Sequence, residues 1–193
     1  MRASITGGDA LIVVDVQSDF TPGGALAAPD GDKVVPPLNE YITHFHRAEL
    51  PIAASRDWHP EDHMSFEGEG GPWPPHCLQG SQGAEYHPDL ELPADTHHVK
   101  KGRDADEEDY SAFEGGPDLD AFLQDNDVER VFVGGLTTEY CVKNTAQDAL
   151  DHGYDVFLLM DAFKPVDPDD GEQAIAHLLE QGAIGLTFDD LVL

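Results

Sequence analysis

The segment RVFVGGLTTEYCVKNTAQDAL, residues 130–150, joins a buried strand to a helix and carries a cysteine between them. Its opening run RVFVG is β-branched and aromatic, which predicts a short strand with both faces covered. Beyond a turn at Gly135, apolar residues recur at helical spacing, and Thr137 or Thr138 is placed to cap the helix. A buried strand that leads directly into a helix is the repeating unit of a parallel α/β sheet.

Cys141 lies in the first turn of this predicted helix, at the carboxyl end of the strand. Unpaired backbone N–H groups and the positive end of the helix dipole meet at such a position. We therefore expect a lowered thiol pKa and a place for an oxyanion. A small, buried and unreactive cysteine fits the same position. The segment alone leaves both interpretations open.

The rest of the chain repeats this alternation of strands and helices. A helical stripe of apolar residues runs from Leu38 to Phe45, and further helices are predicted at about 118–124 and 172–181. The pattern predicts an α/β fold in three layers, α/β/α, with a mainly parallel sheet of six strands. The chain, residues 1–193, is the size of one domain, with a loop-rich insertion at about 57–93. The predicted strands are 10–16, 51–55, 97–102, 130–134, 154–162 and 183–188.

The composition is strongly acidic. Asp and Glu number 39 against 10 Lys and Arg, for a formal charge of -29, while the hydrophobic fraction is an ordinary 40%. Such a surface repels nucleic acid and anionic membranes, so we expect neither as a partner. We find no apolar signal region and no apolar run of membrane-spanning length, and the two cysteines are better explained as free thiols. These features predict a soluble, cytoplasmic protein.

The scattered acidic residues also suggest a halophilic protein, whose solvated carboxylates keep it soluble in concentrated salt. We expect the melting temperature and the activity to rise as KCl increases from low to molar concentration, because salt screens the repulsion between surface carboxylates. Thermal unfolding followed across a KCl series tests this. Unfolding and activity that do not depend on salt would contradict the hypothesis.

Chemically versatile residues follow the ends of four predicted strands. They are Asp15, the pair Asp57 and His59, Lys101, and Cys141. Ligands of open α/β sheets bind beyond the carboxyl ends of the strands, so we expect these side chains to converge on one edge. A thiol, carboxylates, an ammonium and an imidazole together suit nucleophilic catalysis beside a metal.

Each member of this set also has a plainer explanation. Asp15 could cap a turn, as Asp often does. Lys100 and Lys101 are neighbours in a predicted strand and must point to opposite faces, so only one can reach a shared site. The histidines could be ordinary polar residues of a loop, since the chain contains ten.

The spacing Asp57-x-His59 places a carboxylate and an imidazole on the same side of an extended segment. This pair suits a zinc, manganese or iron ion. His76, in the stiff sequence WPPHC, is the natural third ligand, and three protein ligands leave positions open for water or substrate.

Five runs of the sequence together resemble a known family. In order and spacing they are similar to those of the nicotinamidases, which belong to the isochorismatase-like cysteine hydrolases. The similarity covers nearly the whole chain, and DWH and WPPHC are its most specific parts. It implies the isochorismatase-like hydrolase fold and the hydrolysis of nicotinamide to nicotinate and ammonia through a thioester. The runs are VVDVQSDF (13–20), SRDWHPEDHMSF (55–66), WPPHCLQGSQGAEYHP (73–88), KKGRDADEEDYSAF (100–113) and GGLTTEYCVKNTAQDAL (134–150).

The resemblance implies roles for individual residues. The catalytic triad would be Asp15, Lys101 and Cys141, with Lys101 preferred to Lys100 because the family lysine directly precedes glycine. One divalent ion, zinc in preference to manganese or iron, would be held by Asp57, His59 and His76, with His63 or Ser65 near it. The aromatic walls of the substrate pocket would be Phe20, Trp73 and Tyr110.

The resemblance further implies a cis peptide bond between Leu136 and Thr137, which would direct the backbone N–H groups of Thr137 and Cys141 at the oxyanion. The chain departs from the family pattern at Thr137 and Glu139, where relatives carry Ala and Asp, and this leaves the substrate range open. Another amidase or isochorismatase-like hydrolase on the same fold is the alternative function. A homo-oligomer is compatible with the sequence.

Overall fold

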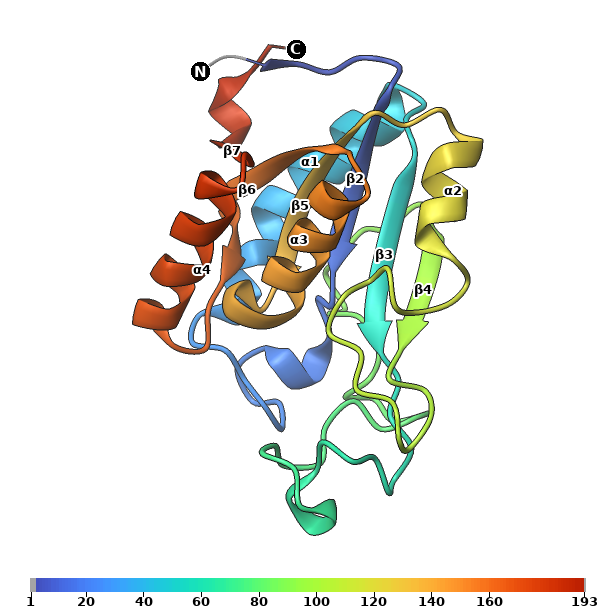
Figure 1. Ribbon diagram of the computed structural model, residues 1–193, viewed down its shortest axis with the longest axis vertical. Coiled ribbons are helices and arrows are strands. Elements are labelled where there is room, and N and C mark those ends of the chain that lie inside the picture. Colours follow the sequence, from blue (N-terminus) through green and yellow to red (C-terminus); the bar gives the residue numbers. More distant parts are fainter. Residues whose placement is uncertain (1–2, 193) are drawn as a thin grey trace.

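The computed structural model describes residues 3–192. Its centre is a six-stranded sheet in the order β4-β3-β2-β5-β6-β7, in which every pair of neighbouring strands is parallel (Figure 1). This confirms the mainly parallel sheet predicted from the alternation of strands and helices. The strands are β2 (Asp9–Val14), β3 (Ile52–Asp57), β4 (His97–Lys101), β5 (Arg130–Leu136), β6 (Asp155–Lys164) and β7 (Ile184–Leu186).

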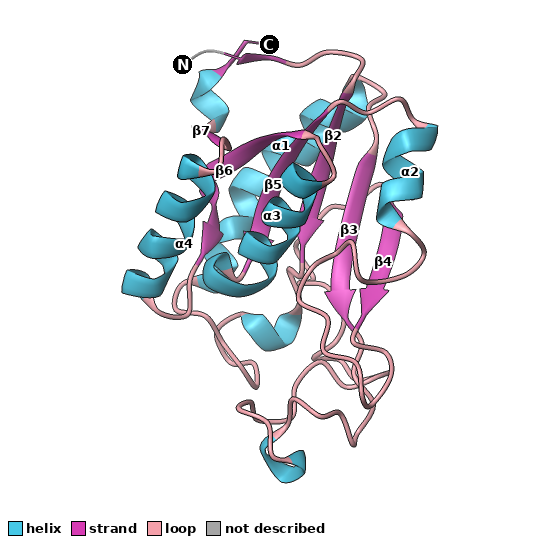
Figure 2. Ribbon diagram, in the orientation of Figure 1, coloured by secondary structure: helices cyan, strands magenta, loops and turns pink. Residues whose placement is uncertain are grey.

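Helices cover both faces of the sheet, which gives the three predicted layers (Figure 2). Side chains of β2 alternate between two cores: Leu11 and Val13 pack on the side of α1 (Val35–Arg47), and Ala10 and Ile12 pack on the other side. Because both faces are buried, the strand is apolar at almost every position. The second core is closed by α2 (Leu119–Asp125), α3 (Lys143–Asp151) and α4 (Pro168–Glu180).

Helix α4 begins at Pro168, before the start predicted at about residue 172. The side chain of Asp167 accepts hydrogen bonds from the backbone N–H groups of Asp169 and Asp170, and Pro168 occupies the first turn, where its missing N–H costs nothing. The short strands β1 (Ala3–Ser4) and β8 (Leu191–Val192), which form a separate parallel pair, were not predicted, because two residues show no periodicity. The short 3-10 helices are η1 (Ser18–Phe20), η2 (Gly31–Val34), η3 (Glu67–Glu69) and η5 (Phe188–Asp190).

The helix that carries Cys141 begins differently from the prediction. Residues Thr138–Val142 form a π-helical turn, η4, and α3 follows it. Thr137 stands at the capping position, but its side chain makes no capping hydrogen bond, and the buried hydroxyl of Thr138 has no hydrogen-bond partner among the described residues. The predicted threonine cap is therefore wrong. The wider turn is closed instead by the N–H of Val142, which donates to the carbonyl of Thr137 over 3.2 Å.

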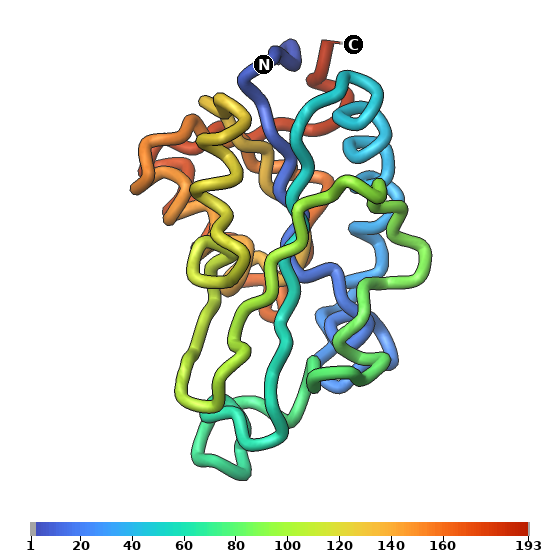
Figure 3. Tube along the Cα trace, turned by 90° about the vertical axis from the view of Figure 1, so that its right-hand side faces the viewer, coloured from blue at the N-terminus to red at the C-terminus, as the bar shows by residue number. Residues whose placement is uncertain are grey.

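The long loops lie together beyond the carboxyl ends of β3 and β4 (Figures 1 and 3). The segment 58–96 contains only the short helix η3 as regular structure. Isolated bridges tie it down: His59 pairs with Leu78, and Tyr86 pairs with Gln17. Within the described part of the chain, no helix is long and apolar enough to cross a membrane.

Candidate active site

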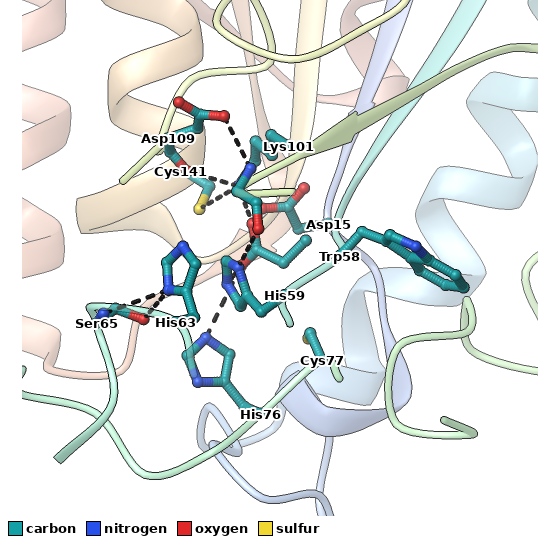
Figure 4. A network of polar contacts seen from close by, with 12 residues as sticks. Asp15, Trp58, His59, His63, Ser65, His76, Cys77, Lys101, Asp109 and Cys141 are labelled. Atoms are coloured by element: carbon teal, nitrogen blue, oxygen red, sulfur yellow. Dashed lines mark hydrogen bonds and ion pairs between the residues drawn. The ribbon is translucent and has the colours of Figure 1, made fainter. Parts of the chain in front are cut away.

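The parallel sheet brings four polar side chains to one edge. Asp57 and Lys101 end the adjacent strands β3 and β4, while Asp15 and Cys141 follow the adjacent strands β2 and β5. The Lys101 Nζ atom lies 2.8 Å from Asp15 Oδ2 and 3.3 Å from Cys141 Sγ, and it is also paired with Asp57 Oδ1 (Figure 4). The geometry thus joins the three residues of the expected triad to one expected metal ligand.

Lys100 and Lys101 point in opposite directions, as strand alternation requires. Lys101 is fully buried at the sheet edge. Lys100 instead lies over the ring of Trp58, with its Nζ atom 4.0 Å from the ring centroid, a cation–π contact on the other face of the strand.

Burial and charge oppose each other in this cluster. Burial disfavours the ammonium of Lys101, but Asp15 and Asp57 outweigh it and hold the pKa of Lys101 well above its usual value. Burial also raises the pKa of Asp15, against the opposing effect of Lys101. Lys101 is therefore a permanent cation, while Asp15 has the raised pKa that suits a group exchanging protons.

Burial raises the pKa of the Cys141 thiol well above its usual value, the Asp15 carboxylate raises it further, and Lys101 only partly compensates. The lowered thiol pKa expected from the end of a helix is therefore wrong for this resting arrangement. Desolvation of the buried sulfur outweighs the dipole of one helical turn. The thiol sulfur lies within 4.8 Å of an Asp15 carboxylate oxygen, so a proton acceptor stands close to it.

A second cluster lies next to this one and contains Asp57, His59 and His76. Their ligand atoms all lie within 4.8 Å of one another, and all three residues are buried. The Nε2 atoms of His59 and His76 are 3.5 Å and 3.9 Å from Asp57 Oδ2. The Nδ1 atoms lie 2.8 Å from the carbonyl oxygens of Gly102 and Pro74, which can only accept. Each ring therefore carries its hydrogen on Nδ1 and presents the Nε2 lone pair, as a divalent metal requires.

The two oxygens of Asp57 serve different neighbours. Oδ1 is paired with Lys101, and Oδ2 faces the two histidine rings. Although burial favours the neutral carboxyl, the Lys101 ammonium holds the pKa of Asp57 well below its usual range. Asp57 is thus an anion that connects the lysine beside the cysteine to the histidine pair.

His63 and Ser65 lie beside this cluster but outside it. The His63 Nδ1 atom is 2.7 Å from the Ser65 hydroxyl, and its Nε2 atom is 2.7 Å from the carbonyl oxygen of Glu107. Both ring nitrogens already have partners, and the ring stacks on His59 with centroids 4.0 Å apart. In this arrangement the His63 ring packs against the face of the His59 ring and supports it.

A pocket beside the two clusters is lined by Cys141, Asp57 and His76. The aromatic residues expected for its walls, Phe20, Trp73 and Tyr110, all line it. Its aromatic and apolar walls suit a small aromatic ring. The remaining lining residues are Leu26, Thr137, Tyr140 and Val166.

Three of these pocket residues, Leu26, Tyr140 and Val166, were not predicted. Tyr140 packs edge-on against Trp73, with ring centroids 5.1 Å apart, and also stacks with Tyr110. Its position directly before Cys141 could have identified it. Leu26 and Val166 carry no such signal, because they reach the pocket from loops distant in the sequence.

The peptide bond between Leu136 and Thr137 is cis, at the position that the family resemblance implies. Leu136 ends β5 and is fully buried. Thr137 lines the pocket together with Cys141, so this junction of the backbone borders the pocket.

Gln17 is a buried residue of the site whose role the sequence did not disclose. Its Nε2 group donates to the carbonyl oxygens of Asp57 and Ala84, over 2.8 Å and 2.9 Å. Its Oε1 atom accepts from the N–H of Asp57 over 2.8 Å. The side chain therefore holds the backbone of Asp57 from both sides and fixes where its carboxylate points.

Replacing Gln17 by Leu should lower the free energy of unfolding by about 3 to 5 kcal/mol, because it leaves one buried N–H and two buried carbonyl groups without partners. Urea denaturation measures this. Gln124→Leu, at an exposed helical position, is the matched control and should change stability by less than about 0.5 kcal/mol. Similar small effects of both substitutions would contradict the proposed clamp on Asp57.

Comparison with known proteins gives a consistent result. Residues 9–190 match the family model "Isochorismatase domain". The chain is 37% identical to the nicotinamidase of Escherichia coli K12, over 94% of this chain and 95% of that protein. It resembles the crystal structure of the pyrazinamidase of Pyrococcus horikoshii in complex with zinc, with 49% identity, a TM-score of 0.90 and coverage of 94% and 99% of the two chains.

The structure of PnC1 from L. infantum in complex with nicotinate is similarly close. It has a TM-score of 0.91 and 34% identity, with coverage of 100% of this chain and 99% of that one. The match to the domain model spans nearly the whole chain, and both the sequence and the fold agree with those of these relatives. The chain therefore belongs to the isochorismatase family, together with these nicotinamidases.

Proposed function

We propose that this protein is a nicotinamidase, a metal-dependent cysteine hydrolase that converts nicotinamide to nicotinate and ammonia through a thioester. One observation carries the proposal. The Cys141 sulfur lies 3.3 Å from the Lys101 ammonium and within 4.8 Å of an Asp15 carboxylate oxygen, and Cys141 lines an aromatic-walled pocket together with Asp57 and His76. The relatives named nicotinamidase and pyrazinamidase support the same substrate class.

The metal ligands in this proposal are Asp57, His59 and His76, and zinc is the favoured ion. The donor set fits, because one anionic carboxylate and two neutral imidazoles with free Nε2 atoms are ordinary zinc ligands. Burial lowers the pKa of His76, which favours the neutral ring that a metal needs. When bound, the ion would supply Lewis acidity for orienting the pyridine nitrogen or for acidifying a water molecule.

The first half of the reaction forms the thioester. Asp15 takes the proton from Cys141, and the sulfur attacks the carboxamide carbon of nicotinamide. Backbone N–H groups of Thr137 and Cys141 stabilise the oxyanion, a contribution of about 3 to 4 kcal/mol per donor in comparable sites. The protonated Asp15 then gives its proton to the departing nitrogen, and ammonia leaves.

The second half hydrolyses the thioester. Asp15, again ionised, removes a proton from a water molecule that attacks the thioester carbonyl. The carbon–sulfur bond breaks and Asp15 returns its proton to the sulfur, while the new carboxylic acid leaves and gives its own proton to solvent as nicotinate. Lys101 remains charged throughout, and it stabilises whichever of Asp15 and Cys141 carries the negative charge.

The decisive experiment measures ammonia release from nicotinamide by the purified protein, before and after treatment with a chelator. We expect turnover, its loss on metal removal, and its return with added Zn²⁺. A panel that also contains pyrazinamide, carbamoyl amides and isochorismate tests the alternative activities of the same fold. Turnover of another substrate without any ammonia release from nicotinamide would contradict the proposal.

A further inference from the structure

Glu139, one of the two departures from the family pattern, makes a specific contact with a distant part of the chain. It lies in the turn η4, two residues before Cys141. Its Oε1 atom accepts hydrogen bonds from the backbone N–H groups of Val166 and Asp167, both over 2.8 Å. Glu139 does not line the substrate pocket, so it acts from behind the pocket wall.

The segment that Glu139 holds forms part of that wall. Val166 lines the pocket together with Thr137, Tyr140 and Cys141, the residues on either side of Glu139 in the sequence. Asp167 is held from its other side as well, because its carboxylate caps the first turn of α4. The short connection between β6 and α4 is therefore fixed at one end by the helix and at the other by the turn that carries Cys141.

The Glu139 carboxylate is committed to this contact. Two consecutive backbone N–H groups converge on one oxygen, an arrangement that favours an acceptor with negative charge. The other oxygen, Oε2, is buried and has no hydrogen-bond partner among the described residues. A solvated surface carboxylate would not bury an oxygen in this way, since desolvation without a partner is costly.

We propose that Glu139 is a positioning residue that determines substrate specificity: it fixes the Val166 wall relative to Cys141 and so sets which ring substituents the pocket accepts. This inference rests on the proposed nicotinamidase activity. Without the carboxylate, Val166 is free to move away from the pocket, and the substrate ring loses a rigid wall without the loss of any catalytic group. The effect should therefore appear in KM and in selectivity more than in kcat.

Glu139→Ala and Glu139→Gln test this, with nicotinamide and a ring-methylated nicotinamide as the two substrates. For Glu139→Ala we expect KM for nicotinamide to rise about tenfold with a smaller change in kcat, and the kcat/KM ratio of methylated to unmethylated substrate to rise about fivefold. Glu139→Gln keeps an acceptor oxygen on a side chain of the same length. Its kcat/KM ratio of methylated to unmethylated substrate should therefore stay close to the wild-type ratio. Val166→Ala, which widens the wall directly, should raise the same ratio even if Glu139→Ala fails to fold.

The control is Asp118→Ala. It removes a carboxylate that caps α2 by accepting a hydrogen bond from Ala121 N–H over 3.0 Å and that does not line the pocket. It should lower the melting temperature and leave the substrate ratio unchanged. If the wild-type protein releases no ammonia from nicotinamide, the proposed function and this inference both fail. If the wild type is active but neither Glu139→Ala nor Val166→Ala changes the ratio, the inference alone is overturned.

Discussion

Cys141→Ala is expected to reduce ammonia release from nicotinamide by at least about 10⁴-fold, because no other group can form the thioester. The proposed metal ligands Asp57, His59 and His76 do not include this cysteine, so the metal content of the variant should stay at the wild-type level. An ammonia assay and a metal analysis of the same preparation measure both quantities. This is the largest effect that the structure predicts.

Cys77→Ala is the matched control for this experiment. Cys77 is the other free cysteine and is also buried, and it packs in the hydrophobic core on the α1 side of the sheet. Its removal should lower stability moderately and leave the chemical step in place. Turnover retained by Cys141→Ala, or an equal loss of activity in both variants, would show that Cys141 is not the nucleophile.

His76→Ala should lower metal affinity and activity together, each by at least about 100-fold. The His76 ring is held by the carbonyl oxygen of Pro74, and its Nε2 atom lies 3.9 Å from Asp57 Oδ2, so alanine removes one of the three donors. Metal bound per chain and competition with a chelator give the affinity, and ammonia release gives the activity.

His46→Ala provides the comparison, because His46 is an exposed histidine of α1 outside the metal cluster. It should leave both metal content and activity unchanged. A metal-free His76→Ala protein with full activity would contradict the proposed role of the metal.

The candidate site is largely predictable because parallel strands all end at the same edge of a sheet. Asp15, Asp57, Lys101 and Cys141 are far apart in the sequence, yet each stands at or just beyond the carboxyl end of a strand. Once the strands are recognised by their apolar runs, the convergence of these residues follows from topology. The choice between Lys100 and Lys101 follows from the resemblance to the family, and strand alternation accounts for their opposite directions.

Other features of the site depend on contacts between loops. Val166 and Leu26 reach the pocket from connections that have no periodicity, and Gln17 holds Asp57 through hydrogen bonds across 40 positions of the chain. The hydrogen bonds of Glu139 likewise span 27 and 28 positions. Irregular backbone follows no repeating pattern, so its partners are decided only when the whole chain has packed.

The amino-acid sequence by itself determined the parallel α/β fold, the edge at which the polar residues meet, and the chemical inventory of that edge. Only the tertiary structure decided how those groups titrate and how they are oriented. The Cys141 thiol illustrates the difference: its place at a helix start predicts a lowered pKa, whereas burial beside Asp15 raises it. Strand and helix periodicity are local properties of the chain, but desolvation and charge depend on every neighbour that folding brings within a few ångströms.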